Sequence, residues 1–293
     1  MRFPAVLGVV AVLASACTAG TATGGRTVVL AAAYPFAWAA QQVGGPDVAV
    51  TDLVKSGAEP HDIELSPRQV GAFQSAGVVV YLHGFQAAVD RATSEAPHQA
   101  LLDLTAAVDV KPPDSALTEA TATGVDPHVW LDPTRMRAIV DAIEAKLVAR
   151  DPAHAASYRS RAATTDAALA DLDATLRRSL QGCVRKDIVT SHTAFAYLAR
   201  RYGLHQVGIA GLSPDGEPSP GRLAEVARFA KKSHVTTIFF ESLVDPKLAQ
   251  TVASEVGART AVLDPVEGVK RGDDYLSVMR RNAAALHDAL GCA

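Results

Sequence analysis

Two histidines and one aspartate occupy positions where open α/β sheets commonly bind ligands. His61 lies just beyond one predicted strand, His192 directly follows the predicted strand 187–191, and Asp264 follows the predicted strand 260–263. In such sheets, ligands bind beyond the carboxyl ends of the strands. We therefore expect each of these three side chains to lie at the rim of its sheet.

A third histidine, His128, lies in the segment Asp126-Pro127-His128-Val129-Trp130-Leu131-Asp132-Pro133. Together with the rim residues it gives three imidazoles and one carboxylate, a donor set that suits tetrahedral coordination of a borderline metal ion. The ligands are too dispersed for a zinc finger, and the chain has no His-Glu-x-x-His helix motif. Spacing alone leaves open that each histidine is an ordinary hydrogen-bonded loop residue.

Short β-rich runs alternate with helical patterns along the chain, which favours parallel sheets covered by helices. The predicted strands are 27–30, 48–53, 78–82, 187–191, 206–209, 236–240 and 260–263, and the predicted helices include 35–43, 223–232, 246–256 and 274–290. Ser66-Pro67 reads as an N-cap followed by the first helical residue. This pattern predicts two α/β lobes, residues 27–150 and 183–293.

The segment between the lobes, residues 151–182, predicts one long helix. Asp151-Pro152 is a favourable helix start, and apolar residues then recur at spacings of three and four until Gly182. A helix from Pro152 to Gln181 would extend about 45 Å at 1.5 Å per residue. It would join the lobes as a rigid strut, although an ordinary helix packed within one lobe fits the same pattern.

Composition excludes several classes of protein. The 293 residues are 48% hydrophobic and 20% charged, with a formal net charge of −3. Such a chain is too apolar to be disordered and too evenly charged to bind nucleic acid through a basic surface. No apolar run beyond residue 16 reaches the ~18 residues that span a bilayer.

The amino terminus has the features of an export signal. A short basic start precedes an apolar run, and Ala14-Ser15-Ala16 leads directly to Cys17. We expect residues 1–16 to be removed and Cys17 to carry a lipid, with 17–26 as a flexible tether. Because Ala14 replaces the leucine usual in lipoprotein signals, secretion with cleavage nearby is the alternative.

The two remaining cysteines, Cys183 and Cys292, are expected to form a disulfide. Exported proteins meet oxidising conditions and seldom keep free thiols. The bond would tie the end of the chain to the start of the second lobe. Two unrelated thiols are the alternative.

Several motifs together resemble the metal-binding solute-binding proteins of bacterial ABC importers for zinc and manganese. They are Glu59-Pro60-His61-Asp62, the segment 126–133, Asp151-Pro152 with Tyr158, residues 191–198 and Glu217-Pro218-Ser219-Pro220. The resemblance covers essentially the whole mature chain. It implies two α/β lobes bridged by one long helix, with the metal in the cleft between them.

Carried over to this chain, the resemblance implies His61, His128, His192 and Asp264 as metal ligands. Manganese-selective relatives tend to place a carboxylate where this chain has His192, so zinc is the expected metal and Mn²⁺ the less favoured one. The implied function is an extracytoplasmic, monomeric zinc receptor, not an enzyme, that delivers its ion to a membrane permease. A manganese or iron receptor, a secreted zinc hydrolase and an adhesin-like surface protein are the alternatives.

Three further residues are expected near the metal without binding it. Glu59 precedes His61, and Glu241 follows a predicted strand, where it would orient a ligand. His83 stands where the family often has asparagine, and we expect a structural role for it. Residues 111–125 contain no histidine, unlike the His-rich loop of many zinc-uptake members.

Overall fold

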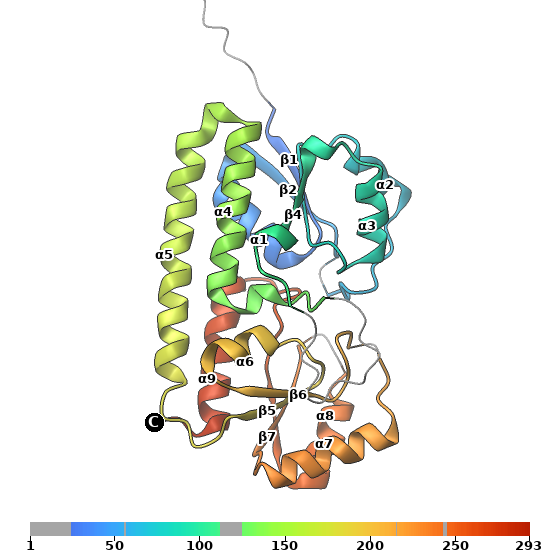
Figure 1. Ribbon diagram of the computed structural model, residues 1–293, viewed down its shortest axis with the longest axis vertical. Coiled ribbons are helices and arrows are strands. Elements are labelled where there is room, and N and C mark those ends of the chain that lie inside the picture. Colours follow the sequence, from blue (N-terminus) through green and yellow to red (C-terminus); the bar gives the residue numbers. More distant parts are fainter. Residues whose placement is uncertain (1–24, 56, 112–124, 215, 243–244) are drawn as a thin grey trace, which may run out of the picture.

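The computed structural model describes residues 25–55, 57–111, 125–214, 216–242 and 245–293, and these form two lobes, each built on a parallel sheet (Figure 1). This confirms the predicted fold class. The predicted signal 1–16 and Cys17 lie outside the described residues.

The first lobe has strand order β2-β1-β3-β4, with every neighbouring pair parallel. Its elements are β1 (Thr27–Ala31), α1 (Tyr34–Gly44), β2 (Val48–Asp52), α2 (Pro67–Phe73), β3 (Val78–Tyr81), α3 (Ala87–Ser94), β4 (Leu101–Asp103) and α4 (Pro133–Arg150). Ser66 caps α2 in a reciprocal capping box with Gln69, as its position before Pro67 predicts. The strand β4 and the helices α3 and α4 were not predicted.

The second lobe repeats this topology, with parallel order β6-β5-β7-β8. Its elements are β5 (Asp187–Thr190), α6 (Ala196–Tyr202), β6 (His205–Gly208), α7 (Pro220–Lys232), β7 (Thr237–Phe240), α8 (Lys247–Val256), β8 (Arg259–Val262) and α9 (Tyr275–Leu290). The strand order reverses between β5 and β7. Ligands of such sheets bind at this switch point, and the loop that carries His192 begins there.

The linking helix α5 spans Ala155–Ser179 after a short 3-10 turn at Pro152–His154. Its 25 residues extend about 37 Å, less than predicted because the first turn is not α-helical and the helix ends at Ser179 instead of Gln181. The predicted apolar stripe from Tyr158 to Leu176 is buried. It packs against α1 and α4 of the first lobe and α9 of the second, so α5 runs beside both lobes (Figure 1).

The hydrophobic core is continuous between the lobes. One cluster includes residues of β1, β3, α4 and α5 together with residues of α9 and the inner face of the second sheet. A second, smaller cluster lies under α7 and α8. Since the larger core joins both lobes, opening the cleft widely would expose apolar surface to water.

The structure joins Cys183 and Cys292 in a disulfide, at the end of the second lobe where the chain terminates (Figure 1). Backbone hydrogen bonds from Val184 to Gly291 and from Arg185 to Leu290 lie beside it. Among the described residues, no helix has the length and apolar character needed to cross a membrane.

Candidate metal centre

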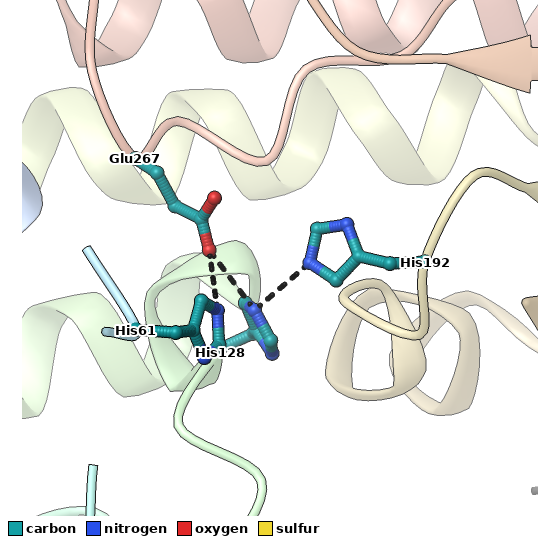
Figure 2. Close-up of side chains that lie close together, drawn as sticks. All are labelled: His61, His128, His192 and Glu267. Atoms are coloured by element: carbon teal, nitrogen blue, oxygen red, sulfur yellow. Dashed lines mark hydrogen bonds and ion pairs between the residues drawn. The ribbon is translucent and has the colours of Figure 1, made fainter. Parts of the chain in front are cut away.

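Three histidines and one glutamate converge between the two lobes. One nitrogen or oxygen atom of each of His61, His128, His192 and Glu267 lies within 4.8 Å of the others (Figure 2). The first two come from the first lobe and the other two from the second. The structure thus brings together the three predicted histidines.

The fourth member of this group differs from the prediction. Glu267 occupies the place expected for Asp264, which is absent from the group among the described residues. The Asp264 carboxylate instead accepts hydrogen bonds from the Ser242 hydroxyl and, at 2.8 Å, from the Val266 backbone N–H. Asp264 therefore shapes the loop, and Glu267, three residues further on, reaches the histidines.

The loop that carries His61 is fixed from α3. Gln86, which precedes α3 and is buried, donates from Nε2 to the backbone oxygens of Ala32 and Pro60, at 3.0 and 2.7 Å. The ring of Phe85 packs edge-on against His61, with centroids 5.0 Å apart. These contacts hold the histidine toward the second lobe, although residues 57–65 around it form neither helix nor strand.

His128 and His192 each have a carboxylate behind the ring. His128 donates from Nδ1 to Asp126 at 2.8 Å, and His192 donates from Nδ1 to Glu241 at 2.6 Å. Both rings are fully buried. A carboxylate on Nδ1 fixes the tautomer and leaves Nε2 directed into the site. Glu241 lies where its predicted role requires, whereas Asp126 was not singled out from the sequence.

The two other predicted neighbours lie further from the site. Glu59 accepts a hydrogen bond from the His61 backbone N–H, and its carboxylate is 3.9 Å from the His61 ring. The side chain of His83 is 68% exposed and pairs with Asp90 at 3.2 Å. His83 is thus on the surface, outside the group of four.

Charge and burial shift the pKa values within the group in opposite directions. Burial would lower the pKa of His128, but the hydrogen bonds to Asp126 and Glu267 outweigh it and raise the pKa to about 10. Glu241 likewise overcomes burial and raises the pKa of His192. Burial lowers the pKa of His61. Burial would raise the pKa of Glu267, but hydrogen bonds from His128 and His61 hold it well below its usual value.

The spacing of the four groups suits a tetrahedral ion. Glu267 Oε1 lies 3.1 Å from Nε2 of both His61 and His128, and the Nε2 atoms of His128 and His192 are 3.3 Å apart (Figure 2). Ligands about 2.0–2.1 Å from a tetrahedral zinc ion are about 3.3 Å from each other. Small adjustments would therefore place all four around one ion.

An acidic cavity of about 280 Å³ adjoins the site on one side. Its wall includes five carboxylate residues, Glu59, Glu241, Asp245, Asp264 and Glu267. A recess lined by one sign of charge concentrates the opposite ion. Glu267 thus belongs both to the group of four and to the wall of this acidic cavity.

Two lobes fastened to one helix, with four ligand groups enclosed between them, define a solute-binding receptor for a single metal ion. The model of the family described as zinc-uptake complex component A, periplasmic (ZnuA), matches residues 29–289. The chain therefore belongs to this family. Its members are receptors, which confirms the predicted class and the prediction that the chain is not an enzyme.

Relatives and solved structures agree with this assignment. The high-affinity zinc uptake system protein ZnuA of Bacillus subtilis is 33% identical over 299 residues, covering 96% of this chain and 93% of that protein. The Zn(II)-bound ZnuA-like domain of Streptococcus pneumoniae AdcA is 33% identical, with a TM-score of 0.78 over 91% of this chain and 99% of the domain. The chain spans 57% of full-length AdcA, a zinc-binding lipoprotein.

A third relative is described as having an adhesin activity in addition to metal transport. The laminin-binding protein Lmb of Streptococcus agalactiae, described as having adhesin and metal-transporting activity, is 32% identical with a TM-score of 0.79. The match covers 91% of this chain and all of that structure. The Zn(II)-bound domain of AdcA and the metal-transporting adhesin Lmb therefore share this two-lobe architecture although their names differ.

Proposed function

We propose that this protein captures Zn²⁺ outside the cytoplasm and delivers it to the membrane permease of an ABC transporter. The observation that carries the proposal is the group of three imidazoles and one carboxylate enclosed between the lobes. The zinc-uptake description of the family and of the Bacillus subtilis relative supports it.

The proposed ligands are His61, His128, His192 and Glu267. Three imidazole nitrogens favour zinc over manganese, which prefers oxygen ligands. Four protein groups complete tetrahedral coordination and leave no place for a catalytic water, as a hydrolase requires. The ion is thus cargo that is held and released unchanged.

We further propose that the mature protein is a monomer anchored by a lipid on Cys17. The small-residue stretch before Cys17 and the description of AdcA as a lipoprotein support the anchor. Mass spectrometry of the protein from its native membrane tests it, because a lipid adds a defined mass at the new amino terminus. An unmodified amino terminus would contradict the anchor without affecting the zinc site.

Metal competition tests the proposed cargo. The mature protein, stripped with a chelator and dialysed against equal Zn²⁺ and Mn²⁺ at pH 7, should contain close to one zinc per chain by elemental analysis. Excess manganese over zinc would contradict the proposal.

Two matched carboxylate variants test the ligand set. Glu267→Gln should weaken zinc binding by about tenfold to a hundredfold, because it removes the anionic ligand. Asp264→Asn should cost less, since Asp264 acts on the loop and not on the ion. The reverse ranking in chelator competition would restore Asp264 as the ligand.

A further inference from the structure

The loop that presents Glu267 contains an unusual backbone conformation. Val266 has φ of +61°, in the left-handed region that β-branched residues rarely adopt. Its side chain is fully buried. A conformation of this kind persists only where surrounding contacts enforce it. The contacts around Val266 therefore decide where the next residue, Glu267, points.

Contacts from the second lobe itself fix the start of this loop. Asn282 of α9 accepts a hydrogen bond from the Asp264 N–H at 2.9 Å and donates to the Asp264 carbonyl oxygen at 2.7 Å. The Asp264 carboxylate accepts from the Val266 N–H. These bonds lock the residue before the turn but do not reach across to the first lobe.

The contact across the lobes comes from Trp130. Its indole Nε1–H donates to the carbonyl oxygen of Pro265 at 2.7 Å, and both residues are buried. Trp130 lies two residues after His128 in the 3-10 turn Val129–Leu131. The Tyr275 hydroxyl, at the start of α9, donates in turn to the Trp130 carbonyl oxygen at 2.6 Å.

We propose that Trp130 is a positioning residue for the metal site. Its indole N–H holds the Pro265-Val266 turn in register with the His128 segment and so sets Glu267 at the correct distance from the histidines. This inference rests on the proposed zinc-binding function. The inference adds that Trp130, a residue of the first lobe, fixes the position of Glu267, a ligand carried by the second lobe.

The chain offers a matched control in its second tryptophan. Trp38 of α1 is also buried, but its Nε1 has no hydrogen-bond partner within the described residues. Its ring packs on Tyr275, with centroids 4.8 Å apart. Trp38→Phe therefore makes the same chemical change in the same core without removing a hydrogen bond to the Glu267 loop.

A double-mutant cycle tests the proposal, with zinc affinity measured by chelator competition. Trp130→Phe should weaken binding by about threefold to tenfold, the range that one net hydrogen bond gives. Trp38→Phe should change it by less than twofold. In the Glu267→Gln background, Trp130→Phe should add less than twofold, because the residue it positions no longer binds as a carboxylate.

The alternatives give different results in the same cycle. Trp130 also packs on the His128 ring, at 5.4 Å between centroids. If it acted through His128, its effect would persist in full with Glu267→Gln, and the proposal would be overturned. An unchanged affinity of Trp130→Phe would overturn it too. Failure of the wild-type protein to bind zinc would instead refute the proposed function.

A spectroscopic measurement separates positioning from a general loss of stability. The visible absorption of bound Co²⁺ reports the ligands, so Trp130→Phe should shift the spectrum toward that of Glu267→Gln, whereas Trp38→Phe should leave it as in wild type. If Trp130→Phe does not fold, Tyr275→Phe removes the hydroxyl that holds the Trp130 backbone and should give a smaller shift in the same direction. A wild-type spectrum in a folded variant would contradict the proposal.

Discussion

The two sides of the metal site differ in how they are enclosed. On the closed side, His128 and His192 are fully buried and each has a carboxylate on Nδ1. On the open side, the His61 side chain is 9% exposed, and the acidic cavity is lined by Glu59 and Glu267 and extends to Glu241 behind His192. The His128 side fixes the geometry of the site, whereas the cavity side carries the carboxylates that attract a cation.

The two sides also differ in the protons they hold without metal. Hydrogen bonds to carboxylates outweigh burial and raise the pKa values of His128 and His192, while at His61 burial outweighs the hydrogen bond to Glu267 and lowers the pKa. At neutral pH the metal-free protein thus carries a proton on His128, where it offsets the charge of the buried carboxylates Asp126 and Glu267. Zinc must displace this proton, but meets a neutral imidazole at His61.

The largest predicted effect is that of pH on zinc affinity. Because the pKa of His128 is about 10, zinc competes with a proton there throughout the neutral range, and the raised pKa of His192 strengthens this competition as the pH falls. Affinity should fall by about tenfold per pH unit for each proton displaced. From pH 8 to pH 6 we expect a loss of more than a hundredfold in chelator competition.

Calorimetry in buffers of different ionisation enthalpy should find proton release on zinc binding at pH 7, chiefly from His128. Removing the closed-side imidazole by His128→Ala should reduce this release, and His61→Ala should leave it unchanged. If the wild-type protein releases no proton on binding zinc at pH 7, the two sides do not differ in the protons that they hold without metal.

The same shift in pKa predicts how the stability of the metal-free protein depends on pH. The pKa of His128 is raised when folded and returns to about 6.5 when unfolded. Its contribution is therefore fully present below pH 6.5 and is lost as pH rises through about 10. Thermal melts of the stripped protein should show a decrease over this window, and His128→Ala should flatten it.

Removing single ligands should give the next largest effect, and the two sides should respond unequally. His128→Ala leaves a gap in a buried region, and we expect a loss of more than a hundredfold in zinc affinity. His61→Ala should cost about tenfold, because water from the adjoining cavity can take the vacated coordination position. His83→Ala is the control, since His83 is exposed and paired with Asp90. Equal losses of zinc affinity in the His61→Ala and His128→Ala variants would contradict the difference in enclosure between the two sides of the site.

Periodicity and strand-end position predicted much of the fold and three of the four side chains that converge between the lobes. The stripe from Tyr158 to Leu176 predicted the linking helix, and the strands preceding His192 and Asp264 placed both residues at the rim of the second sheet. The helix α4 was missed although Met136, Ile139, Ile143 and Leu147 recur at helical spacing and are buried. That pattern was a usable signal.

The fourth member of the group of side chains, Glu267, could not be predicted from the sequence alone. Position after a strand pointed to Asp264, but the loop continues through the left-handed turn at Val266 before Glu267 enters the site. A left-handed valine is intrinsically unfavourable, so local propensity could not predict it. The Trp130 contact that accompanies it joins residues 135 positions apart. The only local signal was a second carboxylate in the same loop.

The smallest predicted effect on zinc binding is that of the disulfide, because Cys183 precedes β5 whereas His192 follows the opposite, carboxyl end of that strand. Cys183 and Cys292 close a loop of 109 positions, for which the chain-entropy model gives up to about 4.7 kcal/mol of stability. The neighbouring hydrogen bonds of Val184 and Arg185 to residues 291 and 290 remain without the bond and hold the two segments together. We therefore expect the Cys183→Ser, Cys292→Ser double variant to lose about 2–4 kcal/mol of stability and to melt several degrees lower. Its zinc affinity should stay within twofold of wild type, because the core that joins α5, α9 and the first lobe still places the ligands. A loss of zinc affinity as large as that of His61→Ala would show that the chain end controls the site. Mass spectrometry that finds two free thiols in the exported wild-type protein would show that the disulfide does not form.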